Sequence, residues 1–289
     1  MPSAPPARYT ALAVLFSLLW ASCFVAVKIG LRSSPPLFLM ASRFVVAGGV
    51  LLALALMRGR HLPRRAAEWR LIVILGLLNY ALYLGLNVVA LQDISAGMGA
   101  VLASTNPLML AVAGPWVLDE PLTARKLGGL LLAFAGVAAV MWTRLGDANQ
   151  PRGMAVALLA IAFLVVGTIV FKRVAPGQDL LVLNAIGLLA AGVALAVPSV
   201  LWEPLHDVRF TPSFLGTQAY LIVAGSWIMM LIWFWLLTHG DATRASAYFF
   251  LNPVLGVFLG ALFLGEPLSA QDLVGTVIVA VGIYVVQRA

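Results

Sequence analysis

The stretch NPLMLAVAGPWVLDEPL at residues 106–122 recurs, with changes, as NPVLGVFLGALFLGEPL at residues 252–268. Each copy opens with an Asn-Pro pair inside an apolar run and closes with Glu-Pro-Leu, and the copies are 146 positions apart. Similarity at a fixed spacing indicates an internal repeat. We therefore expect two related units, residues 1–146 and residues 147–289.

The composition places most of the chain in lipid. Of its 289 residues, 62% are hydrophobic and 10% are charged, and the mean hydropathy is +1.02. A soluble domain carries roughly 25% charged residues, so the composition excludes a water-soluble fold. The net charge of +7 comes from residues between the apolar runs, which fits membrane topology and not a nucleic-acid surface. The single Cys23 and three scattered histidines argue against a disulfide, a metal centre or a cofactor.

Apolar runs of about 20 residues predict ten membrane-spanning helices. We place them at 9–29, 36–57, 69–91, 95–118, 124–143, 153–172, 180–201, 214–237, 242–264 and 270–287. Five spans per unit is an odd number, so the second unit is inverted relative to the first. In transport proteins, inverted repeats enclose a substrate site near the bilayer midplane. The predicted fold is therefore an all-α membrane protein with two inverted five-helix units around a central cavity.

Basic residues in the connections predict the orientation. If the N-terminus is cytoplasmic, twelve Lys and Arg lie on the inner side and five on the outer side. We therefore expect both termini to face the cytoplasm of a bacterial-type inner membrane. We also expect the first apolar run to be kept as a span and not cleaved as a signal peptide, because Trp20 replaces the small aliphatic residue of a cleavage site. Four tryptophans near predicted span ends fit interfacial anchors: Trp69, Trp116, Trp142 and Trp202.

The charges inside the spans bear on the mechanism. No Asp or Glu lies in the middle third of a predicted span. Proton- and sodium-coupled carriers commonly place a carboxylate there, so facilitated diffusion or exchange is favoured over ion coupling. Arg43 lies about seven residues into the second span, roughly 10 Å from its outer end. Its side chain either extends to the outer interface, which we favour, or binds a substrate carboxylate. We expect Lys28, at the end of the first span, to reach the interface.

The Asn-Pro pairs fall in the middle of the fourth and ninth predicted spans. A proline inside a helix frees the carbonyl four residues earlier, and a free carbonyl is costly in hydrocarbon unless another group satisfies it. The amides of Asn106 and Asn252 either do this or bind a ligand. A single kink is usually structural, but the same kink in both units favours hinges at Pro107 and Pro253 in the wall of a central cavity.

The third predicted span carries Asn79, Tyr83 and Asn87 at a spacing of four, which places them roughly on one helix face. This face turns away from lipid, either for hydrogen bonds between helices or for a cavity. The counterparts 146 positions later are Gly225, Met229 and Trp233. A polar-aromatic wall opposite a more apolar one suits an amphiphilic ligand.

Three features are typical of one family: Trp20-Ala21-Ser22 followed by Phe24 and Lys28, the two Asn-Pro helices, and the paired Glu-Pro-Leu ends. Through them, nearly the whole chain resembles the drug/metabolite transporter superfamily. It is similar within it to the EamA-type exporters, including the branch that exports aromatic amino acids and metabolites. The resemblance implies a cavity lined by helices one, three, four, six, eight and nine. Glu120 and Glu266 match the motif, and we expect each to hydrogen-bond the start of the next helix.

The main hypothesis is a non-enzymatic exporter of amino acids, neutral or aromatic ones favoured, that works by alternating access. Its expected partners are a small-molecule substrate and membrane lipid, and its oligomeric state stays open. The candidate substrate-binding residues are Trp20, Ser22, Asn79, Tyr83, Asn87, Thr105, Asn106, Trp227, Tyr248 and Asn252.

Three alternatives remain. A multidrug exporter of cationic compounds is favoured only if a carboxylate lies in the cavity. An intramembrane enzyme needs a His/Asp/Ser constellation that the spans lack. A lipid-handling or structural membrane protein is favoured only if the bundle is sealed, wholly apolar and without a central cavity.

Overall fold

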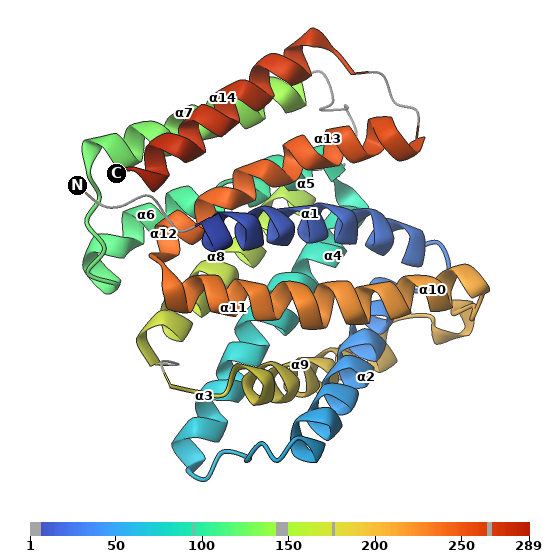
Figure 1. Ribbon diagram of the computed structural model, residues 1–289. Helices are drawn as coiled ribbons and strands as arrows, with labels where there is room; N and C mark the ends of the chain where they lie inside the picture. Colours follow the sequence, from blue (N-terminus) through green and yellow to red (C-terminus); the bar gives the residue numbers. More distant parts are fainter. Residues whose placement is uncertain (1–6, 95, 143–149, 175–176, 265–267) are drawn as a thin grey trace.

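The computed structural model describes residues 7–94, 96–142, 150–174, 177–264 and 268–289. Within these ranges every regular element is a helix, and the helices pack into one bundle (Figure 1). The predicted all-α class is therefore confirmed.

Eight of the predicted spans are helical runs that are long and apolar enough to cross a bilayer. They are α1 (Ala7–Gly30), α2 (Pro36–Met57), α3–η1–α4 (Ala66–Gly76, Leu77–Leu82, Tyr83–Asp93), α7 (Ala124–Met141), α8 (Pro151–Val174), α9 (Leu180–Trp202), α10–η4–α11 (Pro212–Tyr220, Leu221–Met229, Met230–His239) and α14 (Ala270–Gln287). A short 3₁₀ turn, η3 (Leu205–Asp207), follows α9. The bounds agree with the predicted ones to within a few residues, because the apolar runs end where polar connections begin.

The outer surface of these helices is apolar. On α9, Val193, Val197 and Val200 are 61%, 58% and 66% exposed. Such a stripe is typical of a surface that contacts lipid and not water. Trp116, Trp142 and Trp202 are also exposed at or near helix ends, as expected for interfacial tryptophans.

The fourth and ninth predicted spans are interrupted. In the fourth, α5 (Ala96–Ala103) ends before Ser104 and α6 (Asn106–Val117) begins two residues later. In the ninth, α12 (Ala242–Ser246) passes through the 3₁₀ segment η5 (Ala247–Phe250) into α13 (Leu251–Leu264). The count of ten continuous helices is therefore not reproduced.

The interruptions change the role of the two prolines. Pro107 and Pro253 both lie in the first turn of a new helical segment, α6 and α13. A first-turn proline removes no intrahelical hydrogen bond and its fixed φ suits the start of a helix. The expected mid-helix kink is therefore wrong at Pro107, whereas Pro253 lies within the unbroken helical run 242–264. A turn separates α5 from α6 just before Pro107, and the 3₁₀ segment η5 becomes the α-helix α13 two residues before Pro253.

Two π-helical segments lie at matching positions, η1 in the third span and η4 in the eighth. Asn79 in η1 and Gly225 in η4 are 146 positions apart. A π-turn closes its hydrogen bonds over five residues, so it rotates the side chains on either side of it relative to one another. The apolar pattern gives no sign of such a segment.

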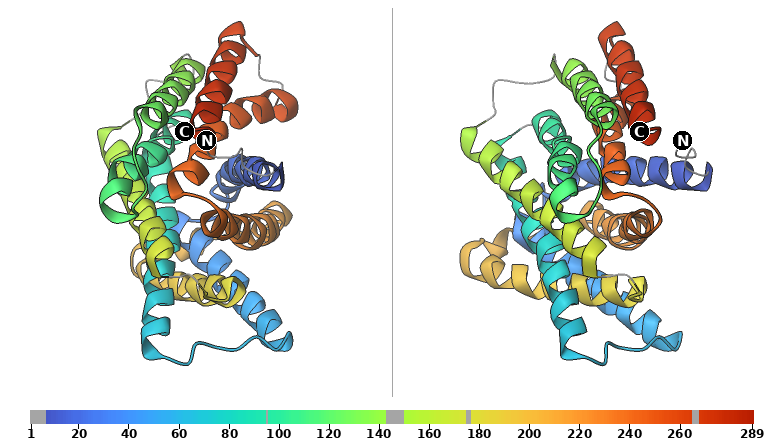
Figure 2. Two further views of the ribbon diagram at one scale, coloured as in Figure 1. Left: turned by 60° about the vertical axis from the view of Figure 1, so that its left-hand side comes forward. Right: turned by 90° about the vertical axis from the view of Figure 1, so that its left-hand side faces the viewer.

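The helices form two groups, one around α1 and the other around α8, and the groups meet where α1 faces α4. In one group α1 packs against α10–η4–α11 and α13, and in the other α8 packs against α4, α5 and α6. α2 lies along α9 and contacts both η4 and α4, while α7 lies along α14 (Figures 1 and 2). Both groups combine elements from before and after residue 146, so the two sequence units interleave. The boundaries of the units stay a prediction from the sequence.

Glu120 joins the end of α6 to the second half of the chain. Its buried carboxylate accepts hydrogen bonds from the N–H groups of Ala242 (2.6 Å) and Thr243 (3.1 Å) and from the Thr243 hydroxyl (3.0 Å). It therefore caps α12, and the expectation that it caps the next helix is wrong. That helix, α7, is capped by Thr123. Glu266 lies outside the described residues.

Glu203 makes a corresponding contact from the second half to the first. Its carboxylate accepts hydrogen bonds from the N–H groups of Leu37 (2.7 Å) and Phe38 (2.8 Å). An anion at a helix N-terminus is favoured by the unpaired N–H groups and by the helix dipole. Two glutamates thus hold the start of a helix that belongs to the other half.

Candidate functional site

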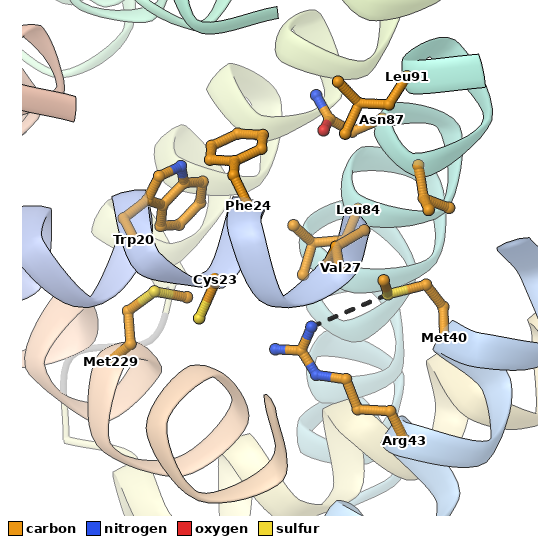
Figure 3. Close-up of a pocket in the computed structure, with 11 residues that line it drawn as sticks. Trp20, Cys23, Phe24, Val27, Met40, Arg43, Leu84, Asn87, Leu91 and Met229 are labelled. Atoms are coloured by element: carbon orange, nitrogen blue, oxygen red, sulfur yellow. Dashed lines mark hydrogen bonds between the residues drawn. The ribbon is translucent and has the colours of Figure 1, made fainter. Parts of the chain in front are cut away.

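A cavity of about 40 Å³ lies between α1 and α4 and is bordered by α2 and η4 (Figure 3). Its lining consists of Trp20, Cys23, Phe24 and Val27 from α1, Leu84, Asn87, Val88 and Leu91 from α4, Met40 and Arg43 from α2, and Met229 from η4. About three waters fill this volume. The space therefore accepts a group of carboxylate size, and a whole amino acid enters only when the two helix groups move apart.

Arg43 is the charged residue among those that line the cavity. It is 3% exposed. Its Nε donates a hydrogen bond to Ser226 Oγ (2.9 Å), and Nη1 faces Met40 Sδ at 3.9 Å. Among the described residues, no carboxylate lies within 4.0 Å of its guanidinium. The favoured expectation, that Arg43 extends to the outer interface, is therefore wrong. Lys28, in contrast, is exposed.

A hydrogen-bond network fixes the Arg43 side chain. Ser226, which accepts from Arg43, lies in η4, and its carbonyl accepts from Asn184 Nδ2 (2.8 Å). The Oδ1 of Asn184 accepts from the Tyr80 hydroxyl (2.5 Å), which comes from η1. The network connects both π-helical segments with α2 and α9. Buried polar groups linked in this way rigidify a site.

Gly225 makes room for the guanidinium. A Cβ at this position would lie 2.4 Å from Arg43 Nη2 and 3.0 Å from Cys23 Sγ. Any other residue would displace the charged group. The glycine, which the sequence showed only as an apolar counterpart of Asn79, is therefore part of the site.

An aromatic cluster forms one end of the cavity. Trp20 stacks on Tyr83 with ring centroids 5.9 Å apart and also contacts Phe249 at 5.0 Å. The Trp20 indole N–H and the Tyr83 hydroxyl are buried without a protein hydrogen-bond partner. Trp20 is the member of this cluster that lines the cavity, and it presents a flat apolar surface there.

The predicted polar face of the third span is divided between two environments. Asn87 lines the cavity, and Tyr83 packs behind Trp20. Asn79 points elsewhere: its Nδ2 donates to the carbonyl of Leu75 (3.0 Å), and its amide packs against Gly167 of α8. Asn79 lies in η1 and the other two in α4, so the π-helical turn rotates Asn79 away from the face expected for a regular helix.

Four other predicted residues lie away from the cavity. Ser22 contacts the Tyr220 hydroxyl (2.6 Å), and Trp227 donates to the carbonyl of Ala47 (3.0 Å). Thr105 donates to the carbonyl of Leu102 (2.7 Å) at the interruption between α5 and α6. The buried Tyr248 accepts a hydrogen bond at its carbonyl from Ser17 (2.9 Å). Three of these contacts join different helices, and the Thr105 contact satisfies a carbonyl of the preceding helix.

Asn106 and Asn252 do not line the cavity, although both are buried. Neither amide has a protein hydrogen-bond partner on either its oxygen or its nitrogen. Each amide lies within the first two residues of the helix that follows an interruption. Buried amides without partners are costly, and their matching positions mark both interruptions as places where the polar contacts are incomplete.

Most of the cavity lining was missed by sequence reasoning. Cys23, Phe24 and Val27 lie on the α1 face that also carries Trp20, so helical spacing from Trp20 was a usable signal. Arg43, a cation far from a span end, is a cavity residue only in the less favoured of the two expectations from the sequence. Met229 was identified only as a counterpart of Tyr83.

The model of the EamA-like transporter family matches residues 8–142 and again residues 151–288. The uncharacterized transporter YvbV of Bacillus subtilis is 26% identical over 286 residues, which cover 99% of this chain and 93% of that protein. The uncharacterized inner membrane transporter YedA of Escherichia coli is 31% identical over 262 residues, with 88% and 83% covered.

A solved structure has the same fold. This crystal structure superposes on the chain with a TM-score of 0.82 at 22% sequence identity, and the match covers 98% of this chain and 99% of the other. Together with the two family matches, which span nearly all of the described helices, these similarities identify the chain as a membrane transport protein. It belongs to the EamA-like transporter family, within the drug/metabolite transporter superfamily.

Proposed function

We propose that the protein exports amino acids, with neutral and aromatic ones favoured, and related metabolites across the bacterial inner membrane. The observation that carries this proposal is the cavity between α1 and α4, walled by Trp20 and Phe24 and bordered by polar groups at Asn87 and Arg43. A mainly apolar pocket with a few polar groups is the usual form of a small-molecule site. The side chain of the substrate lies on the Trp20 surface, and its polar end lies toward Asn87.

Transport follows alternating access. The helix group around α1 moves relative to the group around α8, and this opens the cavity to one side of the membrane at a time. The interruptions before Pro107 and Pro253 are the proposed hinges, because short helices joined by a turn or by a 3₁₀ segment bend more readily than one regular α-helix. Unpartnered amides at Asn106 and Asn252 allow the hydrogen bonds there to change during the movement. Both termini face the cytoplasm in this arrangement.

The transport is facilitated diffusion or exchange. Among the described residues that line the cavity, none is Asp or Glu, and carboxylates are the usual sites of proton or sodium coupling inside a membrane. The substrate's own gradient then drives the movement.

The test is counterflow into proteoliposomes of the purified protein. Vesicles loaded with unlabelled phenylalanine should accumulate labelled phenylalanine, and Trp20→Ala should reduce the rate. Trp142→Ala is the matched control, because Trp142 is 74% exposed and lies outside the cavity. Equal rates for the two variants would remove the cavity from the transport path.

The same assay separates the alternative function. A multidrug exporter would accumulate a labelled quaternary cation and not an amino acid. A buried arginine in the cavity repels such cations, so we expect no accumulation of tetraphenylphosphonium. Counterflow of the cation without counterflow of any amino acid would overturn the proposal.

A further inference from the structure

We propose that Arg43 binds the carboxylate of the transported molecule, and that the cavity selects monocarboxylates by this group whether or not an α-ammonium is present. The proposal rests on the proposed function only in taking the cavity as the transport site. It extends the substrate class from amino acids to 2-oxo, 2-hydroxy and unsubstituted acids with the same apolar side chain.

The first argument is the uncompensated charge. Arg43 is buried, and among the described residues its guanidinium has no carboxylate within 4.0 Å. A buried cation is costly unless it is paired and hydrogen-bonded. The neutral contacts of Arg43 are the Ser226 hydroxyl, the Met40 sulfur and the ring of Phe44, whose centroid lies 5.2 Å from Cζ. An anion from outside the chain completes the site.

The second argument is direction. Nε donates to Ser226, whereas Nη1 faces only the weak acceptor Met40 Sδ at 3.9 Å, so the terminal nitrogens are the ones that a stronger acceptor from a ligand would bind. Figure 3 shows both of them on the side of the guanidinium that faces α1, with a dashed line from Nη1 to Met40. Two parallel N–H groups of a guanidinium match the two oxygens of one carboxylate.

The third argument is preorganisation. The chain from Arg43 through Ser226 and Asn184 to Tyr80 holds the guanidinium in place before any ligand arrives. The missing side chain at Gly225 leaves the room that Nη2 occupies. A group that served only to join helices would not need its charged end to face a cavity.

The fourth argument concerns what is not recognised. Among the described lining residues there is no carboxylate to pair with an ammonium, and Asn87 supplies the one amide. An amide accepts from N–H and donates to a carbonyl or hydroxyl equally well. The α-substituent is therefore recognised as a neutral hydrogen-bonding group. A second carboxylate would lie unpaired among apolar side chains, so dicarboxylates are excluded.

The test measures competition for phenylalanine counterflow in the wild-type protein. Phenylpyruvate, phenyllactate and 3-phenylpropionate should compete about as well as phenylalanine. Phenylalaninamide and phenethylamine, which lack the carboxylate, should compete about 10-fold to 100-fold less well, the range expected for loss of hydrogen bonds to a buried charge. The proposal would be overturned if phenylalaninamide inhibited counterflow at a concentration within about threefold of that needed for phenylalanine, a difference of less than about 1 kcal/mol.

Variants locate the effect. Arg43→Gln should bring the preference for phenylalanine over phenylalaninamide close to one, and Arg43→Lys should retain part of it, because a lysine keeps the charge without the paired N–H groups. Arg60→Gln is the control, because Arg60 is exposed and pairs with Asp179 on the surface. If Arg43→Gln does not fold, Gly225→Ala gives the same readout, since its Cβ displaces Nη2. A preserved preference in the variant that folds would contradict the assignment.

The outcomes distinguish this inference from the proposed function. Counterflow of labelled 3-phenylpropionate but not of any amino acid supports the carboxylate site and rejects amino-acid export. Counterflow of amino acids with unchanged competition by the amide rejects the carboxylate site and keeps amino-acid export. If neither 3-phenylpropionate nor any amino acid is transported, both the carboxylate site and amino-acid export are rejected.

Discussion

Replacing Glu120 with glutamine should weaken the contact between α6 and α12. In the structure, Oε1 accepts from Ala242 N–H, and Oε2 accepts from both the N–H and the hydroxyl of Thr243. The glutamine keeps one oxygen for Ala242 but turns an NH₂ group toward the two donors of Thr243. Two hydrogen bonds to a charged group are lost, each about 1.5–3 kcal/mol when counted alone. Because such losses are not additive, we expect about 3 kcal/mol in total.

The assay is thermal unfolding of the purified protein in detergent. A loss of about 3 kcal/mol corresponds to a decrease in Tm of roughly 6–12 °C. Glu68→Gln is the control, because Glu68 accepts from the N–H groups of Arg64 and Arg65 at the start of its own helix, α3, on the surface. We expect Glu68→Gln to lower the free energy of unfolding by only about 0.5–1 kcal/mol. A Tm for Glu120→Gln equal to that of the control would refute the cross-link between the two halves.

Four further predictions concern packing, binding, gating and topology. Gly76→Ala should destabilise the protein by about 1–3 kcal/mol, because its Cβ would lie 2.4 Å from the carbonyl oxygen of Gly187; Gly128→Ala, with nothing within 4 Å, should be neutral or slightly stabilising in the same unfolding assay. Trp20→Ala should raise the KM for phenylalanine about tenfold, as expected for the loss of an aromatic contact and its apolar area, and an unchanged KM would remove Trp20 from the site. Pro107→Ala should slow counterflow without changing the binding constant, because the added N–H allows α5 and α6 to join into one stiffer helix; a normal rate would show that this interruption is not a hinge. Labelling of cysteines introduced at residues 2 and 289 should find both on the cytoplasmic side, and opposite sides would contradict the predicted span count.

The sequence predicts the positions of the helices well, because the membrane imposes one rule on every span. Apolar runs must be long enough to cross the bilayer, and their polar connections mark the ends. The α2 and α14 bounds are reproduced residue for residue. The repeat also drew attention to the Asn-Pro positions, where both interruptions occur.

The local geometry could not be predicted in the same way. A π-helical segment such as η1 has no compositional signal, and its wider turn, with hydrogen bonds closed over five residues, separates Asn79 from the face of Tyr83 and Asn87. The partner of Glu120 is also invisible to the sequence, because α12 lies more than 100 positions away and its contact depends on how the two halves interleave. From the sequence, the interface is the favoured place for the Arg43 side chain, because a long side chain usually extends there. Its burial follows from the space at Gly225 and the acceptor at Ser226, which come from a different span.

The most direct test of the central claim is protection of Cys23, the single cysteine of the chain, which lines the cavity. The rate of its modification by methyl methanethiosulfonate in the purified protein should fall as phenylalanine or 3-phenylpropionate is added, and phenylalaninamide should have little effect. Cys23→Ala, which removes the reaction, is the control for specific labelling. A modification rate that stays constant at concentrations that saturate transport would show that the substrate does not occupy the cavity between α1 and α4.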